Sequence, residues 1–83
     1  MEYYLILARS VTYAQRMERI LAKAGIRCQI FRASRDLTEL GCAYALKVLT
    51  TDIISVLYIL RSNSLDPLKV FFFQNHAYRE VII

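Results

Sequence analysis

The sequence contains no tryptophan, one proline, one histidine, two glycines and two cysteines. Two cysteines are too few for a disulfide scaffold, and they form neither a CxxC pair nor a zinc-binding pattern with the single histidine. We therefore expect neither a metal nor a cofactor, and we interpret His76 as an ordinary surface residue. Reduced thiols are typical of a reducing compartment, so we expect a cytoplasmic protein.

Long apolar runs are also missing. No run approaches the ~18 residues that a membrane span requires. The first residues lack a basic segment followed by an apolar one and a cleavage site. We expect no membrane partner. The 83 residues are 57% hydrophobic and 22% charged, which predicts one globular domain over residues 1–83 with a core at about 2–73. A chain of this size has a marginal core, and oligomerisation often stabilises such a core.

The net charge of +4 does not gather in one segment. Nucleic-acid-binding domains concentrate basic residues on one face, so we expect no nucleic-acid partner. RNA-recognition domains share the order of elements predicted below, and Tyr3, Tyr4 or Tyr44 could stack on bases. The strands lack the glycine and aromatic signature of those domains, however, and this interpretation is the weakest of three.

The apolar pattern predicts strands at residues 3–8, 26–31, 42–48 and 67–73 and helices at residues 10–25 and about 52–61. The order β-α-β-β-α-β predicts an α+β, ferredoxin-like split fold: a four-stranded antiparallel sheet with both helices on one face. Residues 74–83 form a tail or an added edge strand, which could pair within the chain or with another subunit.

Both predicted helices carry local signals. Ser10 or Thr12 can cap the first helix, Thr12 and Gln15 match a capping box, and Gly25 supplies a C-terminal stop.

The second helix is apolar on more than its core face. Ile54, Tyr58 and Ile59 lie off the stripe that a core would bury. Together with the apolar strand at 67–73, which we place at a sheet edge, these residues predict a homodimer interface.

The two thiols occupy different positions in this fold. In the split arrangement, the end of the first strand, the first turn of the first helix and the loop before Cys42 meet at one end of the sheet. A helix start and a nearby arginine, from Arg9, Arg32 or Arg35, lower the pKa of a thiol below about 8.5. Cys28 lies on the apolar face of a strand, where packing is its expected role. From the residues alone, Cys42 can be either reactive or structural.

Three segments of the chain, "RSVTYAQRMERILAKAGIRCQI", "SRDLTELGCAYALKV" and the helix and strand that follow, resemble a bacterial family of small selenium/sulfur carrier-like proteins. The likeness runs from Met1 to about Phe73. Family members typically have Cys-Gly where this chain has Cys42-Ala43. The resemblance implies a carrier that holds sulfur or selenium on Cys42 as a persulfide or perselenide and that meets donor and acceptor proteins. The residues expected around this thiol are Arg9, Ser10, Arg35, Thr38 and Gly41.

A second hypothesis belongs to another class of protein. Small domains with this order of elements often act as regulatory or protein-interaction modules without chemistry of their own. The apolar second helix motivates this hypothesis. Both hypotheses favour a carrier or binding module over a stand-alone enzyme.

Overall fold

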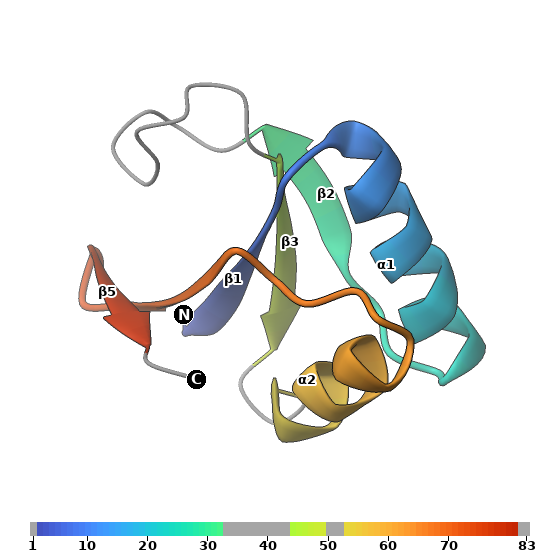
Figure 1. Ribbon diagram of the computed structural model, residues 1–83. Coiled ribbons are helices and arrows are strands. Elements are labelled where there is room, and N and C mark those ends of the chain that lie inside the picture. Colours follow the sequence, from blue (N-terminus) through green and yellow to red (C-terminus); the bar gives the residue numbers. More distant parts are fainter. Residues whose placement is uncertain (1, 33–43, 50–52, 82–83) are drawn as a thin grey trace.

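A computed structural model of the chain describes residues 2–32, 44–49 and 53–81 (Figure 1). Its elements are β1 (Tyr3–Ala8), α1 (Val11–Lys23), β2 (Gln29–Arg32), β3 (Tyr44–Leu49), α2 (Ile53–Ser62), β4 (Lys69–Gln74) and β5 (Ala77–Val81). The fold is α+β, with two helices and an antiparallel sheet, as the sequence predicts.

The sheet has the strand order β2-β3-β1-β4-β5, and every neighbouring pair is antiparallel. The first strand therefore lies in the middle of the sheet, next to β3 as predicted. Residues 5–8 of β1 are buried, which agrees with an element that is apolar on both alternating faces. The prediction of four strands was wrong, because the described part of the chain forms five.

The fifth strand follows from a tight turn between β4 and β5. Asn75 and His76 have φ angles of 54° and 61°, and Gln74 pairs with Ala77 across the turn. Two central residues with positive φ define the two-residue turn whose twist matches antiparallel strands. Residues 77–81 thus pair within the chain, and β4 is an interior strand. Our placement of that apolar strand at a sheet edge was wrong.

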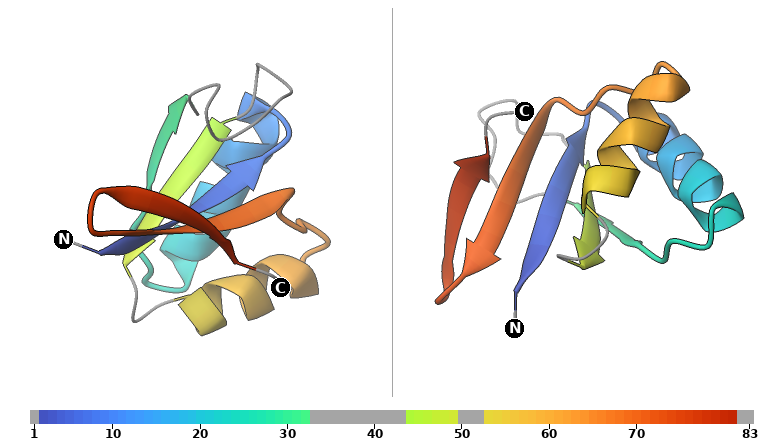
Figure 2. Two further views of the ribbon diagram at one scale, coloured as in Figure 1. Left: turned by 90° about the vertical axis from the view of Figure 1, so that its left-hand side faces the viewer. Right: turned by 90° about the horizontal axis from the view of Figure 1, so that it is seen from below.

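Both helices lie on one face of the sheet (Figure 2). The core between the helices and the sheet is one cluster that includes Met17 and Leu21 of α1, Leu60 of α2, Ile6 of β1 and Leu46 of β3, each with no exposed surface. Burial of each such side chain contributes roughly 1.5–3 kcal/mol. Within the described residues, neither helix is long and apolar enough to cross a membrane.

The opposite face of the sheet has a smaller buried cluster. Leu5, Leu7, Ala45 and Phe71 form it, and Tyr3 packs against it. The sheet is therefore apolar on both faces along its central strands.

The ends of α1 show which of the predicted capping signals operate. Ser10 is the N-cap, and its Oγ accepts a hydrogen bond of 3.2 Å from the backbone N–H of Tyr13. Thr12 lies inside the helix, so the alternative capping box was wrong. Gly25 has a φ of 80°, and the backbone N–H of Ile26 donates to the Leu21 carbonyl at 2.9 Å. This geometry is the glycine stop that the sequence predicts.

Candidate functional site

The start of α1 lies beside the ends of two central strands. Ala8, the last residue of β1, pairs with Tyr44, the first residue of β3. Arg9 and Ser10 connect Ala8 to α1, and the guanidinium carbon of Arg9 lies 5.2 Å from the centre of the Tyr13 ring. The first turn of α1 contains no acidic residue. Its unpaired N–H groups and partial positive charge are therefore not offset within the helix.

Four of the predicted site residues, Arg35, Thr38, Gly41 and Cys42, lie outside the described residues. The structure locates two others, Arg9 and Ser10, at the start of α1. Arg9 is exposed, while the side chain of Ser10 is engaged in capping. The grouping of the other five residues around the thiol of Cys42 thus stays a prediction.

Cys28 is the thiol that the structure describes. It is half-buried just before β2 and packs against the core between the helices and the sheet. Burial, and then the negative charge of Glu18, raise the pKa of the Cys28 thiol from 9.0 to about 11. The thiol is consequently protonated near neutral pH, which makes it a poor nucleophile.

A cavity of about 1040 Å³ opens around Cys28, between α1, the chain leading into β2, and the end of β3. The cavity lies where β2 is not yet paired with β3, because β2 begins at Gln29. We expected a strand over residues 26–31, but the pairing with β3 stops at Gln29 opposite Lys47. Residues 26–28 leave the sheet before β3 ends, and the separation of the two segments creates the cavity.

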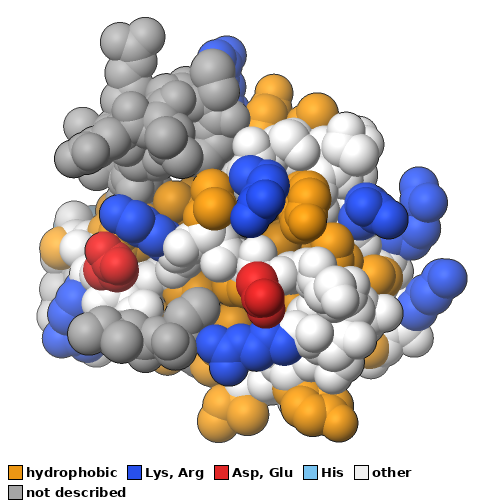
Figure 3. All heavy atoms as spheres, viewed as in Figure 1, with side chains coloured by type: hydrophobic (Ala, Val, Ile, Leu, Met, Phe, Trp, Pro, Cys, Tyr) orange, Lys and Arg blue, Asp and Glu red, His pale blue; other side chains and the backbone are white. Residues whose placement is uncertain are grey.

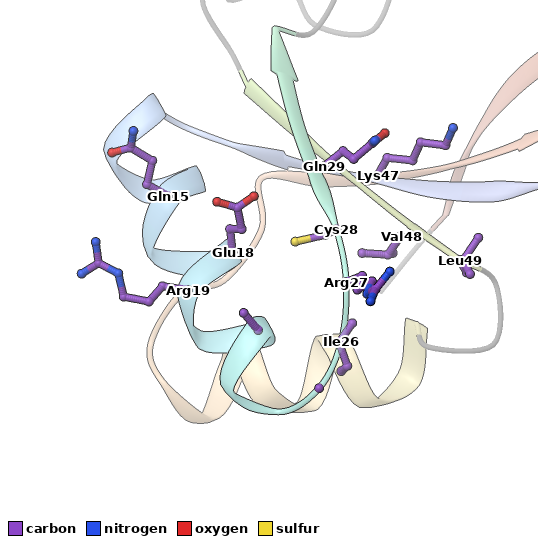
Figure 4. Close-up of a pocket in the computed structure, with 12 residues that line it drawn as sticks. Gln15, Glu18, Arg19, Ile26, Arg27, Cys28, Gln29, Lys47, Val48 and Leu49 are labelled. Atoms are coloured by element: carbon purple, nitrogen blue, oxygen red, sulfur yellow. The ribbon is translucent and has the colours of Figure 1, made fainter.

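The cavity has two sides. Cys28 Sγ points towards α1, where Glu18 lies, whereas Gln29 and Lys47 project from the other side of β2 (Figure 4). Arg27 and Leu49 also lie on that other side (Figure 4). One side of the cavity thus carries the thiol and a carboxylate, and the other carries two cations.

Sequence reasoning missed this cavity. The alternation of apolar and polar side chains over residues 26–30 resembles a strand whether or not the backbone is paired. Gly25 was the one available signal, because the helix stop turns the chain sharply just before this segment.

The residues predicted for a homodimer interface differ in exposure. Ile54 and Tyr58 are 82% and 73% exposed, but Ile59 is half-buried and packs against the core. Hydrophobic side chains reach the surface over α2 (Figure 3). Of these three residues, Ile54 and Tyr58 are therefore the ones whose side chains can contact another molecule.

The tyrosines considered for base stacking do not share one surface. Tyr4 and Tyr44 pack against the core on the helix side of the sheet, and Tyr3 lies on the other side. The Tyr3 ring stacks on Phe73 with centroids 4.8 Å apart, and Lys47 Nζ lies 4.4 Å from its centroid. A hydrogen bond to Tyr78, together with burial, raises the pKa of Tyr3 to about 12.

His76 lies exposed in the turn between β4 and β5, 6.4 Å from Phe73 by ring centroids. Across residues 2–32, 44–49 and 53–81, no group of three or more His, Cys, Asp or Glu side chains could hold a metal ion.

The described residues form an α+β fold whose one described thiol, Cys28, has a raised pKa. The chain matches the family model described as "Putative Se/S carrier protein-like" over residues 3–71, and it belongs to that family. The resemblance noted in the sequence is confirmed. No curated protein and no solved structure matches the chain.

Proposed function

We propose that this protein carries sulfur or selenium on the thiol of Cys42, as a persulfide or perselenide. The observation that carries the proposal is the state of the other thiol. Cys28 is half-buried and its pKa is raised to about 11, so it is a poor acceptor at neutral pH. Since the chain has two cysteines, the family's carrier role falls to Cys42.

The position of β3 supports this choice. Cys42 precedes Tyr44 by two residues, and two residues span at most about 7 Å. Tyr44 pairs with Ala8 next to the start of α1. The positive end of α1 and the cation of Arg9 would stabilise a thiolate there. Arg35, Thr38 and Gly41 precede the thiol in the sequence, and we propose that they shape its surroundings.

The chemistry needs no metal and no second cysteine. The Cys42 thiolate attacks the terminal sulfur of a donor persulfide. A new sulfur–sulfur bond forms on Cys42, the donor's bond breaks, and the donor leaves as a thiolate. An acceptor nucleophile then removes the terminal sulfur and restores the Cys42 thiolate. No net oxidation occurs in either transfer, and selenium follows the same scheme.

Intact-mass measurement after incubation with a persulfide donor tests the proposal. We expect wild type and Cys28→Ser to gain one sulfur atom that a reductant removes, and Cys42→Ala to gain none. Loading of Cys42→Ala, or equal loading on both cysteines, would contradict the proposal.

Alkylation across pH gives an independent prediction. In Cys42→Ala, the rate of Cys28 modification should rise towards an apparent pKa near 11. In Cys28→Ser, the rate for Cys42 should level off below about pH 8.5, the value of an unperturbed thiol. A Cys42 thiol that titrates above that value argues against a carrier.

Exposed side chains on α2 favour a second function, a dimeric regulatory or protein-interaction module. Ile54 and Tyr58 are 82% and 73% exposed and lie one helical turn apart, where they form a continuous apolar strip. A second copy of the chain would cover it.

Light scattering at micromolar concentration tests the dimer. We expect wild type to be dimeric, Tyr58→Glu to be monomeric, and the control Gln15→Glu, on the exposed face of α1, to stay dimeric. A monomeric wild type would refute the module as we describe it.

The strand order also supports a proposal about the fold. Without β5, the order is β2-β3-β1-β4, with helices after β1 and β3. We propose that these elements form a ferredoxin-like split arrangement, extended by one strand within a single domain.

We also propose that the protein is cytoplasmic. A reducing compartment keeps a cysteine such as Cys42 in the reduced form that the carrier chemistry needs.

A further inference from the structure

The two edge strands of the sheet differ in how well they are protected. β2 and β5 stand at the two ends of the strand order, so no described strand pairs with the outer side of either. β5 carries the charged residues Arg79 and Glu80, and Glu80 Oε1 lies 3.9 Å from Lys69 Nζ. Charged side chains of this kind keep an edge from pairing with another chain. β2 has Ile30 and Phe31 at its centre instead, so it is the less protected edge.

The outer side of β2 offers backbone hydrogen-bonding groups. In an antiparallel pair, residues that direct N–H and C=O towards the neighbouring strand alternate with residues that direct both groups away. β2 pairs with β3 from Gln29 to Arg32, so alternate residues of this run present both groups at the edge of the sheet. In Figure 4, β2 lies in front of β3, with α1 on one side of it. An extended chain can therefore add to this edge as a further strand.

The side chains next to this edge are apolar on one face of the sheet and polar or basic on the other. Cys28 and Ile30 are half-buried and pack against the core on the α1 side, where Glu18 also lies (Figure 4). Arg27 and Gln29 alternate with them and are exposed on the opposite face. Successive side chains of a strand point to opposite faces, so one added strand contacts both sets. Its apolar side chains would lie beside Cys28 and Ile30, and its acidic ones beside Arg27.

We propose that the outer edge of β2 binds an extended segment of a partner protein as an added strand, and that this segment alternates apolar and acidic residues. The far end of β2 lies near the proposed carrier thiol, because Arg32 pairs with Tyr44, which follows Cys42 by two residues. The partner is therefore a donor or acceptor of sulfur or selenium. That identity rests on the proposed carrier function, whereas the binding of the strand does not.

A second copy of the chain fits this edge less well than an acidic partner. It would bring its own Arg27 and Arg32 to the same edge, and like charges on neighbouring strands oppose pairing. Binding of an acidic strand that weakens as the protein concentration rises would show that a second copy takes the edge instead. That result would overturn the proposal.

Fluorescence anisotropy with a labelled peptide tests the proposal. The probe is a fluorescein-labelled peptide of about eight residues that alternates valine and glutamate, because β-branched residues favour a strand. We expect saturable binding to wild type and about tenfold weaker binding to Arg27→Glu, because like charges then face each other. Arg79→Glu makes the same change on the other edge strand and should bind like wild type. A peptide with lysine in place of glutamate should prefer Arg27→Glu to wild type. Equal weakening in the two variants would overturn the proposal.

Two N-methylated forms of the probe distinguish strand addition from attraction between charges alone. One form carries methyl groups on the valine amides, and the other carries them on the glutamate amides. Alternate N–H groups of an added strand face β2, so one form should bind about tenfold more weakly and the other like the parent peptide. Equal affinities of the two forms would contradict the pairing that we propose.

Cys28 reports whether the probe binds at this edge. In Cys42→Ala it is the remaining thiol, and its alkylation by iodoacetamide at alkaline pH can be timed. A saturating probe should slow this reaction several-fold, and an unchanged rate would mean that the peptide binds elsewhere, against the proposal. Because Cys42→Ala should bind the probe like wild type, failure of strand binding is distinguishable from failure of the carrier.

Discussion

The two helices cover the same face of the sheet but present different outer surfaces. α1 turns polar residues outward, and Gln15, Arg16 and Arg19 are all exposed. α2 exposes Ile54 and Tyr58 at 82% and 73%. The inner faces of both helices therefore pack on the core, whereas their outer faces differ in chemistry. The outer side of α1 is polar and borders a cavity, and that of α2 exposes two large hydrophobic side chains.

Their ends differ as well. α1 is capped by Ser10 at its start, and Gly25 follows its C-cap residue Ala24. Gly25 has the backbone freedom that its φ of 80° requires. α2 ends with the same reversal, in which the N–H of Leu65 donates to the Leu60 carbonyl at 2.8 Å. The residue in the left-handed conformation is Ser64, however, with a φ of 59°. Both helices thus end in the same backbone geometry, with glycine in the left-handed position after α1 and serine in that position after α2.

The largest effect should come from the inner faces, where the helices are alike. Leu21 of α1 and Leu60 of α2 have no exposed surface. Replacement of either by alanine leaves a cavity and should lower the free energy of unfolding by about 3 kcal/mol. Urea titration at fixed protein concentration measures this. A loss below about 1 kcal/mol in one variant alone would show that its helix contributes little to the core.

A smaller change in the free energy of unfolding should distinguish Ser10, the N-cap of α1, from Thr12, the other capping residue that the sequence allowed. Ser10→Ala removes the acceptor of the Tyr13 N–H and should lower the free energy of unfolding by about 1 kcal/mol. Thr12→Ala, two residues later and exposed, is the control and should have little effect. The opposite ranking would mean that the helix begins at Thr12 in solution.

The comparison also explains what the sequence could predict. β1 was predicted to its exact bounds because its residues are apolar on both faces, which only a central strand satisfies. The stop at Gly25 was predicted because glycine adopts positive φ freely. In both places a local feature of the sequence, an apolar run or a glycine, meets one physical demand.

Prediction of secondary structure from the sequence failed where one pattern of side chains is compatible with several backbone conformations. Residues 26–28 alternate like a strand but leave β3, because pairing depends on the partner and not on alternation. The turn at Asn75 and His76 lacks glycine at its second position, so the sequence predicts residues 74–83 as either a tail or an added edge strand and does not decide between the two. The cavity arises from the first of these places and could not be read from the pattern.

The smallest effect we predict concerns the end of α2. A left-handed conformation costs a residue with a side chain roughly 1–2 kcal/mol, and glycine loses about 0.5–1 kcal/mol of that gain through its freer unfolded state. Ser64→Gly should therefore raise the free energy of unfolding by about 0.5 kcal/mol.

The matched substitution at the end of α1, Gly25→Ala, should have the opposite effect on the free energy of unfolding. A Cβ added at Gly25 would meet no atom within 4 Å, so Gly25→Ala isolates the conformational cost. It should lower the free energy of unfolding by about 1 kcal/mol. Paired urea titrations of the two variants measure both signs. If Ser64→Gly destabilises the protein, the serine side chain must make a compensating interaction, and the two helix ends are then not equivalent.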